Sequence, residues 1–158
     1  MDLESDVIKK LLSEMDDKAK SDIYLREIAL LMEQIEELEG KIRVKENIIK
    51  SFDVKHGAIK SVCYTINNKI AYASDVSFIN KKNYSQIYKL KYFIIDCLRE
   101  EPHPSHYSLN EILSLIKEIK PETTILTNLH SSLDYKKLKK KLPKSVLPAY
   151  DGMKLIVN

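Results

Sequence analysis

The sequence predicts an α/β fold, in which a layered sheet alternates with helices. Short runs of Val, Ile, Tyr and Thr recur between residues 41 and 157, and amphipathic stretches separate the later runs. The composition agrees, because 44% of the 158 residues are hydrophobic and 31% are charged, as is usual in globular chains. We therefore expect either one domain or one small domain with an appendage.

Residues 1–40 are predicted to form an amphipathic helical segment. Apolar residues recur there every three or four positions, in two stretches divided near residue 16, and Gly40 is a natural helix end. Residues 1–50 hold nine Lys and Arg against thirteen Asp and Glu, net −4, whereas residues 51–158 are net +7. The segment is interpreted either as an ordinary helix pair that packs on the rest of the chain or as a dimerisation seam.

From Lys41 onward the spacing of apolar residues along the sequence becomes typical of β-strands. The turn pair Asn67-Asn68 joins two of the runs into a hairpin. The predicted strands are Ile42–Val44, Ile48–Val54, Ile59–Ile66, Ile70–Ala73, Tyr92–Ile95, Thr124–Thr127 and two short runs between Val146 and Val157, on either side of Asp151-Gly152.

Three helices are expected between the later strands. Tyr84–Tyr88 is a short one, and a capping box, Ser108 to Glu111, begins a longer one that ends before Pro121. Asp134–Leu142 is a Lys-rich helix whose charges are either a solvated face or a phosphate-binding surface.

Histidine and aspartate recur where predicted strands end. His56, Asp75, Asp96 and His130 each end or follow a different strand. Groups just beyond strand ends line the crevice in which open α/β sheets bind ligands. Imidazole and carboxylate together are the usual ligands of zinc and of other divalent transition metals. The pattern indicates a metal site, although each such residue alone is more often structural.

Five segments resemble the later motifs of metallo-β-lactamase-fold, metal-dependent hydrolases, in particular the branch of phosphoribosyl cyclic phosphate phosphodiesterases. The resemblance covers about residues 41–158 and corresponds to the C-terminal half of that fold only. The segments are 53–57 (DVKHG), 70–77 (IAYASDVS), 102–109 (PHPSHYSL), 126–135 (LTNLHSSLDY) and 148–153 (PAYDGM).

The resemblance implies two divalent metals, Zn or Mn, and phosphodiester hydrolysis. It implies that His56 binds the first metal, that Asp75 bridges both, and that His106 acts as the general acid or contacts phosphate. The family's commonest Thr-His pair is Thr127-Asn128 here, so either His130 or Asn128 takes the last ligand position, and we assign it to His130. Residues expected to surround the ligands are Asn128, His103 and Asp96.

The defining motif of the family, His-x-His-x-Asp-His, does not occur in the sequence, which has no His before residue 56. We therefore expect a truncated hydrolase: the second half of an αββα sandwich, with a mixed sheet, two or three helices on one face and an added N-terminal helical segment. Two protein ligands for each ion are fewer than the three that a catalytic zinc site keeps, so the chain alone is expected to bind metal poorly and to be inactive.

Two other functions stay open. One is a non-catalytic helical interaction or dimerisation module built on residues 1–40. The other is one subunit of a split hydrolase, completed by an N-terminal fragment that carries the missing motif. A half-fold leaves apolar sheet surface exposed, which favours a partner, a homo-oligomer or cover by residues 1–40.

The remaining observations concern location and partners. The sequence has no run of about 20 apolar residues, it begins with acidic residues, and Cys63 and Cys97 are isolated thiols. These features predict a cytoplasmic protein without a membrane as partner. The resemblance implies a phosphodiester-type small-molecule substrate, and no specific nucleic acid is expected as partner.

Overall fold

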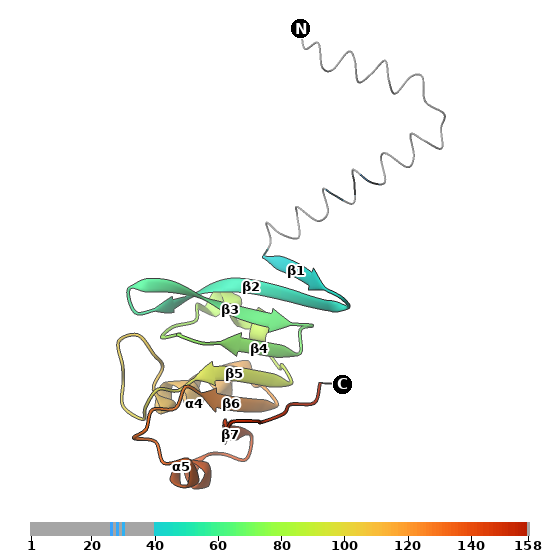
Figure 1. Ribbon diagram of the computed structural model, residues 1–158. Helices are drawn as coiled ribbons and strands as arrows, with labels where there is room; N and C mark the ends of the chain where they lie inside the picture. The colour runs from blue at the N-terminus through green and yellow to red at the C-terminus, as the bar shows by residue number, and fades with distance from the viewer. Residues whose placement is uncertain (1–25, 27, 29, 31–39, 158) are drawn as a thin grey trace, which may run out of the picture. The chain divides into compact units, whose positions relative to one another are not determined.

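The computed structural model describes residues 40–157, together with Arg26, Ile28 and Leu30, which are helical. Contacts divide the chain into residues 1–39 and 40–158, and the strands of the described residues belong to the second unit (Figure 1). The helix pair predicted for residues 1–40 lies almost wholly outside the described residues. Among the described residues, no helix has the length and apolar character needed to cross a bilayer.

One mixed sheet of seven strands organises the second unit, with the strands side by side in chain order (Figure 1). The first four strands pair antiparallel, and from β4 to β7 the pairing is parallel. The strands are β1 (Lys41–Val44), β2 (Asn47–His56), β3 (Ile59–Ile66), β4 (Ile70–Ala73), β5 (Tyr92–Asp96), β6 (Thr123–Thr127) and β7 (Val146–Pro148).

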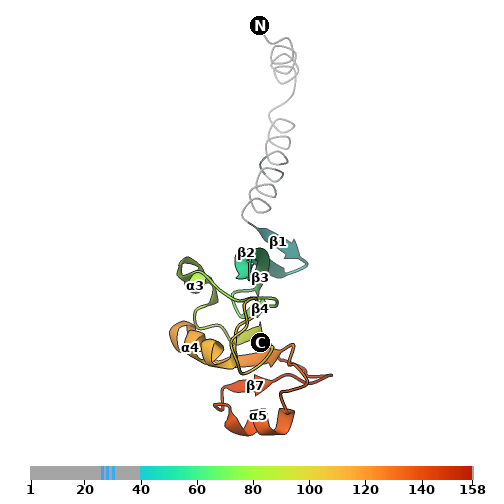
Figure 2. The ribbon, with the colours of Figure 1, turned by 90° about the vertical axis from the view of Figure 1, so that its left-hand side faces the viewer.

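Helices connect the parallel strands, as right-handed crossovers require a chain segment that packs back on the sheet. The 3₁₀ helix η1 (Lys81–Asn83) and α3 (Tyr84–Ile87) follow β4, α4 (Leu109–Ile119) follows β5, and α5 (Tyr135–Lys141) follows β6. α3 and α4 lie on the same side of the sheet (Figure 2). The predicted α/β class, with a mixed sheet and helices on one face, is confirmed.

Local sequence explains where α4 begins and ends. The Ser108 side chain accepts from the Glu111 backbone N–H, and the Glu111 carboxylate accepts from the Ser108 backbone N–H, so the capping box is formed. Lys120 adopts the left-handed conformation at the C-terminus, and Pro121 follows. Four residues of this helix turn inward and are buried: Leu109, Ile112, Leu115 and Ile119.

The core lies between these helices and one face of the sheet. A row of register partners crosses that face from Cys63 to Ala73, Ile95 and Leu126, all with no exposed surface. Phe93, also fully buried, contributes about 2–3 kcal/mol through burial alone.

The opposite face of the sheet carries no helix among the described residues (Figure 2). Val62, Tyr64 and Tyr72 remain 36%, 46% and 41% exposed, and Tyr64 and Tyr72 are register partners on adjacent strands. Apolar residues therefore occupy both sides of the β3–β4 hairpin, as a sheet that is covered on both faces would need.

One predicted strand is absent. The run after Gly152 has no ladder partner among the described strands, and only β7 forms in the region from Val146 to Val157. The hydroxyl of Tyr92 donates instead to the Ile156 carbonyl at 3.1 Å. This side-chain contact stands where the apolar pattern predicted a backbone ladder.

Candidate metal centre

The polar residues at strand ends come together at one edge of the sheet. β2 is parallel to β4, because each is antiparallel to β3, and β5 and β6 continue the parallel arrangement. His56 and Asp96 are the last residues of β2 and β5, Asn128 follows β6 directly, and Asp75 lies two residues after the end of β4. This shared direction explains why the carboxyl ends of four strands supply one site.

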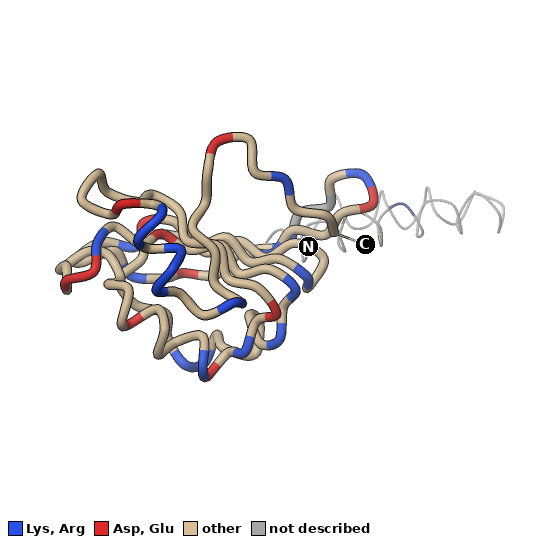
Figure 3. The backbone as a smooth tube through the Cα atoms, turned by 90° about the horizontal axis from the view of Figure 1, so that it is seen from below, with Lys and Arg blue, Asp and Glu red and all other residues tan. Residues whose placement is uncertain are grey.

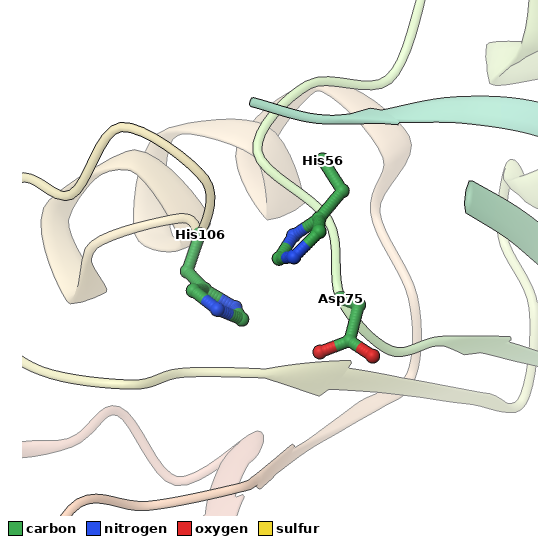
Figure 4. Close-up of side chains that lie close together, drawn as sticks. All are labelled: His56, Asp75 and His106. Atoms are coloured by element: carbon green, nitrogen blue, oxygen red, sulfur yellow. The ribbon is translucent and has the colours of Figure 1, made fainter. Parts of the chain in front are cut away.

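Three of these side chains form a cluster that could hold a metal ion. His56, Asp75 and His106 each offer a ligand atom, and the three atoms lie within 4.8 Å of one another. Figure 4 shows the two imidazoles and the carboxylate directed toward a common space from three separate segments. His106 comes from the loop between β5 and α4, which sequence periodicity does not place.

The hydrogen bond of His56 fixes which ring nitrogen is free. Its Nδ1 lies 2.7 Å from the carbonyl oxygen of Ser105. Since a carbonyl can only accept, Nδ1 carries a proton, and in the neutral imidazole Nε2 then keeps its lone pair. A metal-binding imidazole needs this tautomer with its second nitrogen held by a carbonyl or carboxylate.

His106 is oriented in the same way by a buried carboxylate. Its Nδ1 is hydrogen-bonded to Oδ2 of Asp96, whose side chain has no exposed surface. The other oxygen of Asp96 accepts from the Val76 backbone N–H at 3.4 Å. Burial raises the pKa of Asp96, and the nearby charge of Asp75 raises it further. The two hydrogen bonds and the charge of His106 lower the pKa, but they do not cancel the effect of burial.

Asp75 is held at the site by its backbone. Its φ of 52° lies in the left-handed region, which Asp tolerates better than most residues. Two positions later the Ser77 N–H donates to the Lys55 carbonyl at 2.6 Å, and the Ser77 hydroxyl accepts from the Gly57 N–H at 3.0 Å. The segment after β4 is thereby tied to the end of β2, so Asp75 and His56 stay together.

The structure does not bring His130 into the cluster. Its Nδ1 accepts from the Ser132 N–H at 3.2 Å and lies 3.0 Å from the Ser132 hydroxyl, and the imidazole is exposed. The prediction that His130 joins His56 and Asp75 therefore has no support in the geometry. Asn128 lies nearer, since its amide Nδ2 donates to the hydroxyl of Ser74 at 3.1 Å, one residue before Asp75.

The remaining predicted residues surround the cluster. The His103 ring lies 5.2 Å from that of His106, and the rings of His56 and His106 lie 4.7 Å apart. Sequence reasoning missed Ser105, which acts through its backbone carbonyl; no side-chain motif marks such a residue.

The lysines of α5, among the blue segments spread along the tube in Figure 3, are exposed.

The donor set fits a divalent transition metal. Two imidazoles whose Nδ1 atoms are held elsewhere, and one carboxylate, are ligands that zinc and manganese both accept. His56, Asp75 and His106 are the residues that would surround such an ion.

Comparison with solved structures decides the fold. The chain superposes on a diphosphatase of the PhnP family with a TM-score of 0.72 and 26% sequence identity, over 76% of this chain and 47% of that one. The metallo-β-lactamase-fold protein YhfI from Bacillus subtilis matches with a TM-score of 0.58 at 15% identity, over 72% of this chain and 51% of that chain. The chain therefore has the fold of about half of a metallo-β-lactamase-fold protein. Human tRNase Z, short form, matches with a TM-score of 0.57 at 15% identity over 74% of this chain and 47% of that chain. Zn²⁺-bound PqqB from Methylobacterium extorquens matches with a TM-score of 0.61 at 14% sequence identity, over 75% of this chain and 54% of that chain.

These matches confirm the resemblance to proteins of the metallo-β-lactamase fold. The chain spans about half the length of the solved metallo-β-lactamase-fold proteins that it matches. No protein-family profile and no curated protein matches the sequence.

Proposed function

We propose that this chain supplies the metal-binding second half of a metal-dependent hydrolase that cleaves phosphodiester bonds. The observation that carries the proposal is the cluster of His56, Asp75 and His106, with both imidazoles oriented for Nε2 to face the cluster. The similarity to a diphosphatase favours hydrolysis at phosphorus. The excess of seventeen Lys and Arg over ten Asp and Glu in residues 51–158 suits an anionic substrate.

His56 and Asp75 are proposed as the metal ligands, with zinc or manganese as the ion. A bound divalent metal supplies a hydroxide at neutral pH and polarises the phosphoryl oxygen. His106 is proposed to donate a proton to the leaving oxygen through Nε2. The Asp96 carboxylate supports this role because it accepts the Nδ1–H and stabilises the imidazolium.

Metal binding tests the proposed ligands. The chelator-treated protein is titrated with Co²⁺ and followed by its visible absorption, and the His56→Ala and Asp75→Ala variants are expected to lose about 100-fold or more in affinity, since each removes a direct ligand. His130→Ala is the matched control and should bind as the wild type, because His130 lies outside the cluster. Equal loss in His130→Ala and His56→Ala would contradict the assignment.

The same titration separates two roles for His106. If His106 is the acid, His106→Ala keeps the Co²⁺ affinity. Loss of affinity to the level of His56→Ala would instead make His106 a ligand, which its place in the cluster also allows.

Further ligands are proposed to come from a complementary segment that carries the His-x-His-x-Asp-His motif. Val62, Tyr64 and Tyr72 are exposed on the sheet face that none of the described helices covers, which favours such a partner. The chain alone is then expected to hydrolyse bis(p-nitrophenyl) phosphate negligibly, and adding the unmatched half of the PhnP-family diphosphatase should raise turnover. One tightly bound pair of metals in the chain alone, with full turnover, would show that no further segment is needed.

A further inference from the structure

The five-residue segment 102–106, between β5 and α4, reaches both imidazoles of the cluster. Its Ser105 carbonyl accepts the Nδ1–H of His56, and its last residue is His106. Asp96 fixes the ring of His106, so the ring of His56 depends on where the backbone of Ser105 is held.

His103 holds that backbone. Its Nδ1 accepts from the Ser105 N–H at 3.3 Å and lies 3.1 Å from the Ser105 hydroxyl. An N–H can only donate, so Nδ1 of His103 is the unprotonated nitrogen, and the hydroxyl can donate to it as well. Pro102 and Pro104 flank His103 and restrict φ on either side, which leaves the segment few conformations. Partial burial lowers the pKa of His103, and Arg99 and the two neighbouring imidazoles lower it further, in keeping with an acceptor.

Gly57 allows this segment to lie directly against the end of β2. A Cβ at Gly57 would meet the Ser105 Cβ at 3.2 Å and the Pro104 carbonyl oxygen at 3.5 Å, and the φ of Gly57 is +60°. The close approach explains how a backbone carbonyl from a loop comes within hydrogen-bond distance of the neighbouring residue, His56.

We infer that His103 is a positioning residue: through Nδ1 it holds Ser105 in the conformation whose carbonyl fixes the Nδ1–H tautomer of His56 and leaves Nε2 for the cluster. The two imidazoles then have separate orienting groups, a carboxylate for His106 and a histidine-held carbonyl for His56. The use of this orientation in metal binding rests on the proposed function, whereas the tautomer itself does not.

The chain contains a matched control for this inference. His130 and Ser132 repeat the spacing and both contacts of His103 and Ser105, on an exposed loop whose histidine is outside the cluster. Removing the His130 ring therefore breaks the same local arrangement without touching the carbonyl that holds His56.

The experiment measures the imidazole ¹⁵N shifts of His56 in ¹⁵N-labelled, metal-free protein. The wild type and His130→Ala should show a protonated Nδ1 and an unprotonated Nε2. His103→Ala should show a mixture of tautomers, and His103→Asn should restore the single tautomer, because the Asn oxygen takes the place of Nδ1 as acceptor. Co²⁺ affinity should fall by about 10- to 100-fold in His103→Ala, the range for residues that orient a ligand, and recover in His103→Asn.

A single Nδ1–H tautomer in His103→Ala would overturn the inference, and so would His103→Asn behaving like His103→Ala. If His103→Ala does not fold, His103→Gln tests the inference instead. The acceptor oxygen of Gln lies one bond further from the backbone than Nδ1 of His, so the mixture of tautomers should appear in this variant. A single Nδ1–H tautomer of His56 in His103→Gln would also overturn the inference. Since the shifts are read without metal, the result stands even if Co²⁺ does not bind at all, which would contradict the proposed function alone.

Discussion

Replacing Asp96 by Asn tests how the site orients His106, because the change removes a charge and keeps the shape. In the wild type one carboxylate oxygen accepts from the Val76 N–H and the other from His106 Nδ1. An amide has one acceptor and one donor group, so it cannot accept both bonds. If its oxygen stays with Val76, its NH₂ faces Nδ1, and the imidazole proton moves to Nε2.

The size of the effect follows from burial. Keeping the proton on Nδ1 would leave a donor facing a donor at a fully buried side chain, which costs about 1–3 kcal/mol. That cost favours the shifted tautomer by about 5- to 150-fold. With His106 as the acid, the Co²⁺ affinity should stay at the wild-type level, and a fall by a similar factor would instead make His106 a ligand. The measurement is the ¹⁵N shift of His106, followed by Co²⁺ titration.

Asp53→Asn is the control, since it makes the same chemical change at an exposed carboxylate paired with Lys60. It should leave the His106 shifts and the Co²⁺ affinity unchanged. An Asp96→Asn variant that retains protonated Nδ1 on His106 would refute the argument that the carboxylate sets the tautomer.

The same substitution has an expected effect on stability. The pKa of Asp96 in the folded chain is raised above its ordinary 3.8, so folding favours the protonated form. The stability that this group contributes is fully present below pH 3.8 and is lost as the pH rises through the raised pKa. Asn does not titrate, so the unfolding free energy of Asp96→Asn, relative to the wild type, should increase with pH across that window and then level off. Urea unfolding over a pH series measures it, and a difference that falls with pH would contradict the sign.

Three further outcomes are expected. Burial raises the pKa of both Cys63 and Cys97 to about 12. Neither thiol should therefore react with a disulfide reagent at pH 8 until the chain is unfolded. Prompt labelling of the native protein would contradict their burial. Ser108→Ala removes the cap of α4 and should lower the unfolding free energy by about 1 kcal/mol in urea. Phe93→Ala should cost about 3–5 kcal/mol, because the ring is fully buried against the sheet, and a loss below 1 kcal/mol in the same assay would contradict its place in the core.

The elements of the fold were predictable where periodicity or a local signal specifies them. The alternating run from Ile59 to Ile66 and the turn at Asn67 specify a hairpin, and the capping box at Ser108 specifies the first residue of α4. The strand predicted after Gly152 does not form, because a strand needs a neighbouring strand with which to hydrogen-bond, and an apolar run does not by itself provide one.

Strand direction makes part of the site predictable, whereas His106, which lies in a loop, was expected only from the resemblance. His56 and Asp75 follow strands that run the same way, so their meeting at one sheet edge follows from topology. His130 also follows a parallel strand, yet Asn128 before it has a φ of 53°, and the His130 N–H donates to the Leu98 carbonyl at 3.0 Å. One left-handed residue redirects the chain after a strand, so nearness to a strand end does not decide where the side chain points.

The sequence predicted Asp96 and His103 near the ligands, but not that their hydrogen bonds orient the two rings. The tautomer of His56 depends on a backbone carbonyl, and the carbonyl depends in turn on His103, two positions earlier in a loop flanked by prolines. A motif records the types of side chain near a metal, whereas the lone pair that binds the metal is set by the hydrogen bond on the opposite nitrogen. In this chain the two imidazoles are oriented by different chemistries, a buried carboxylate and a held carbonyl. Substitutions at Asp96 and His103 should therefore alter the tautomer of one ring each and leave the other unchanged.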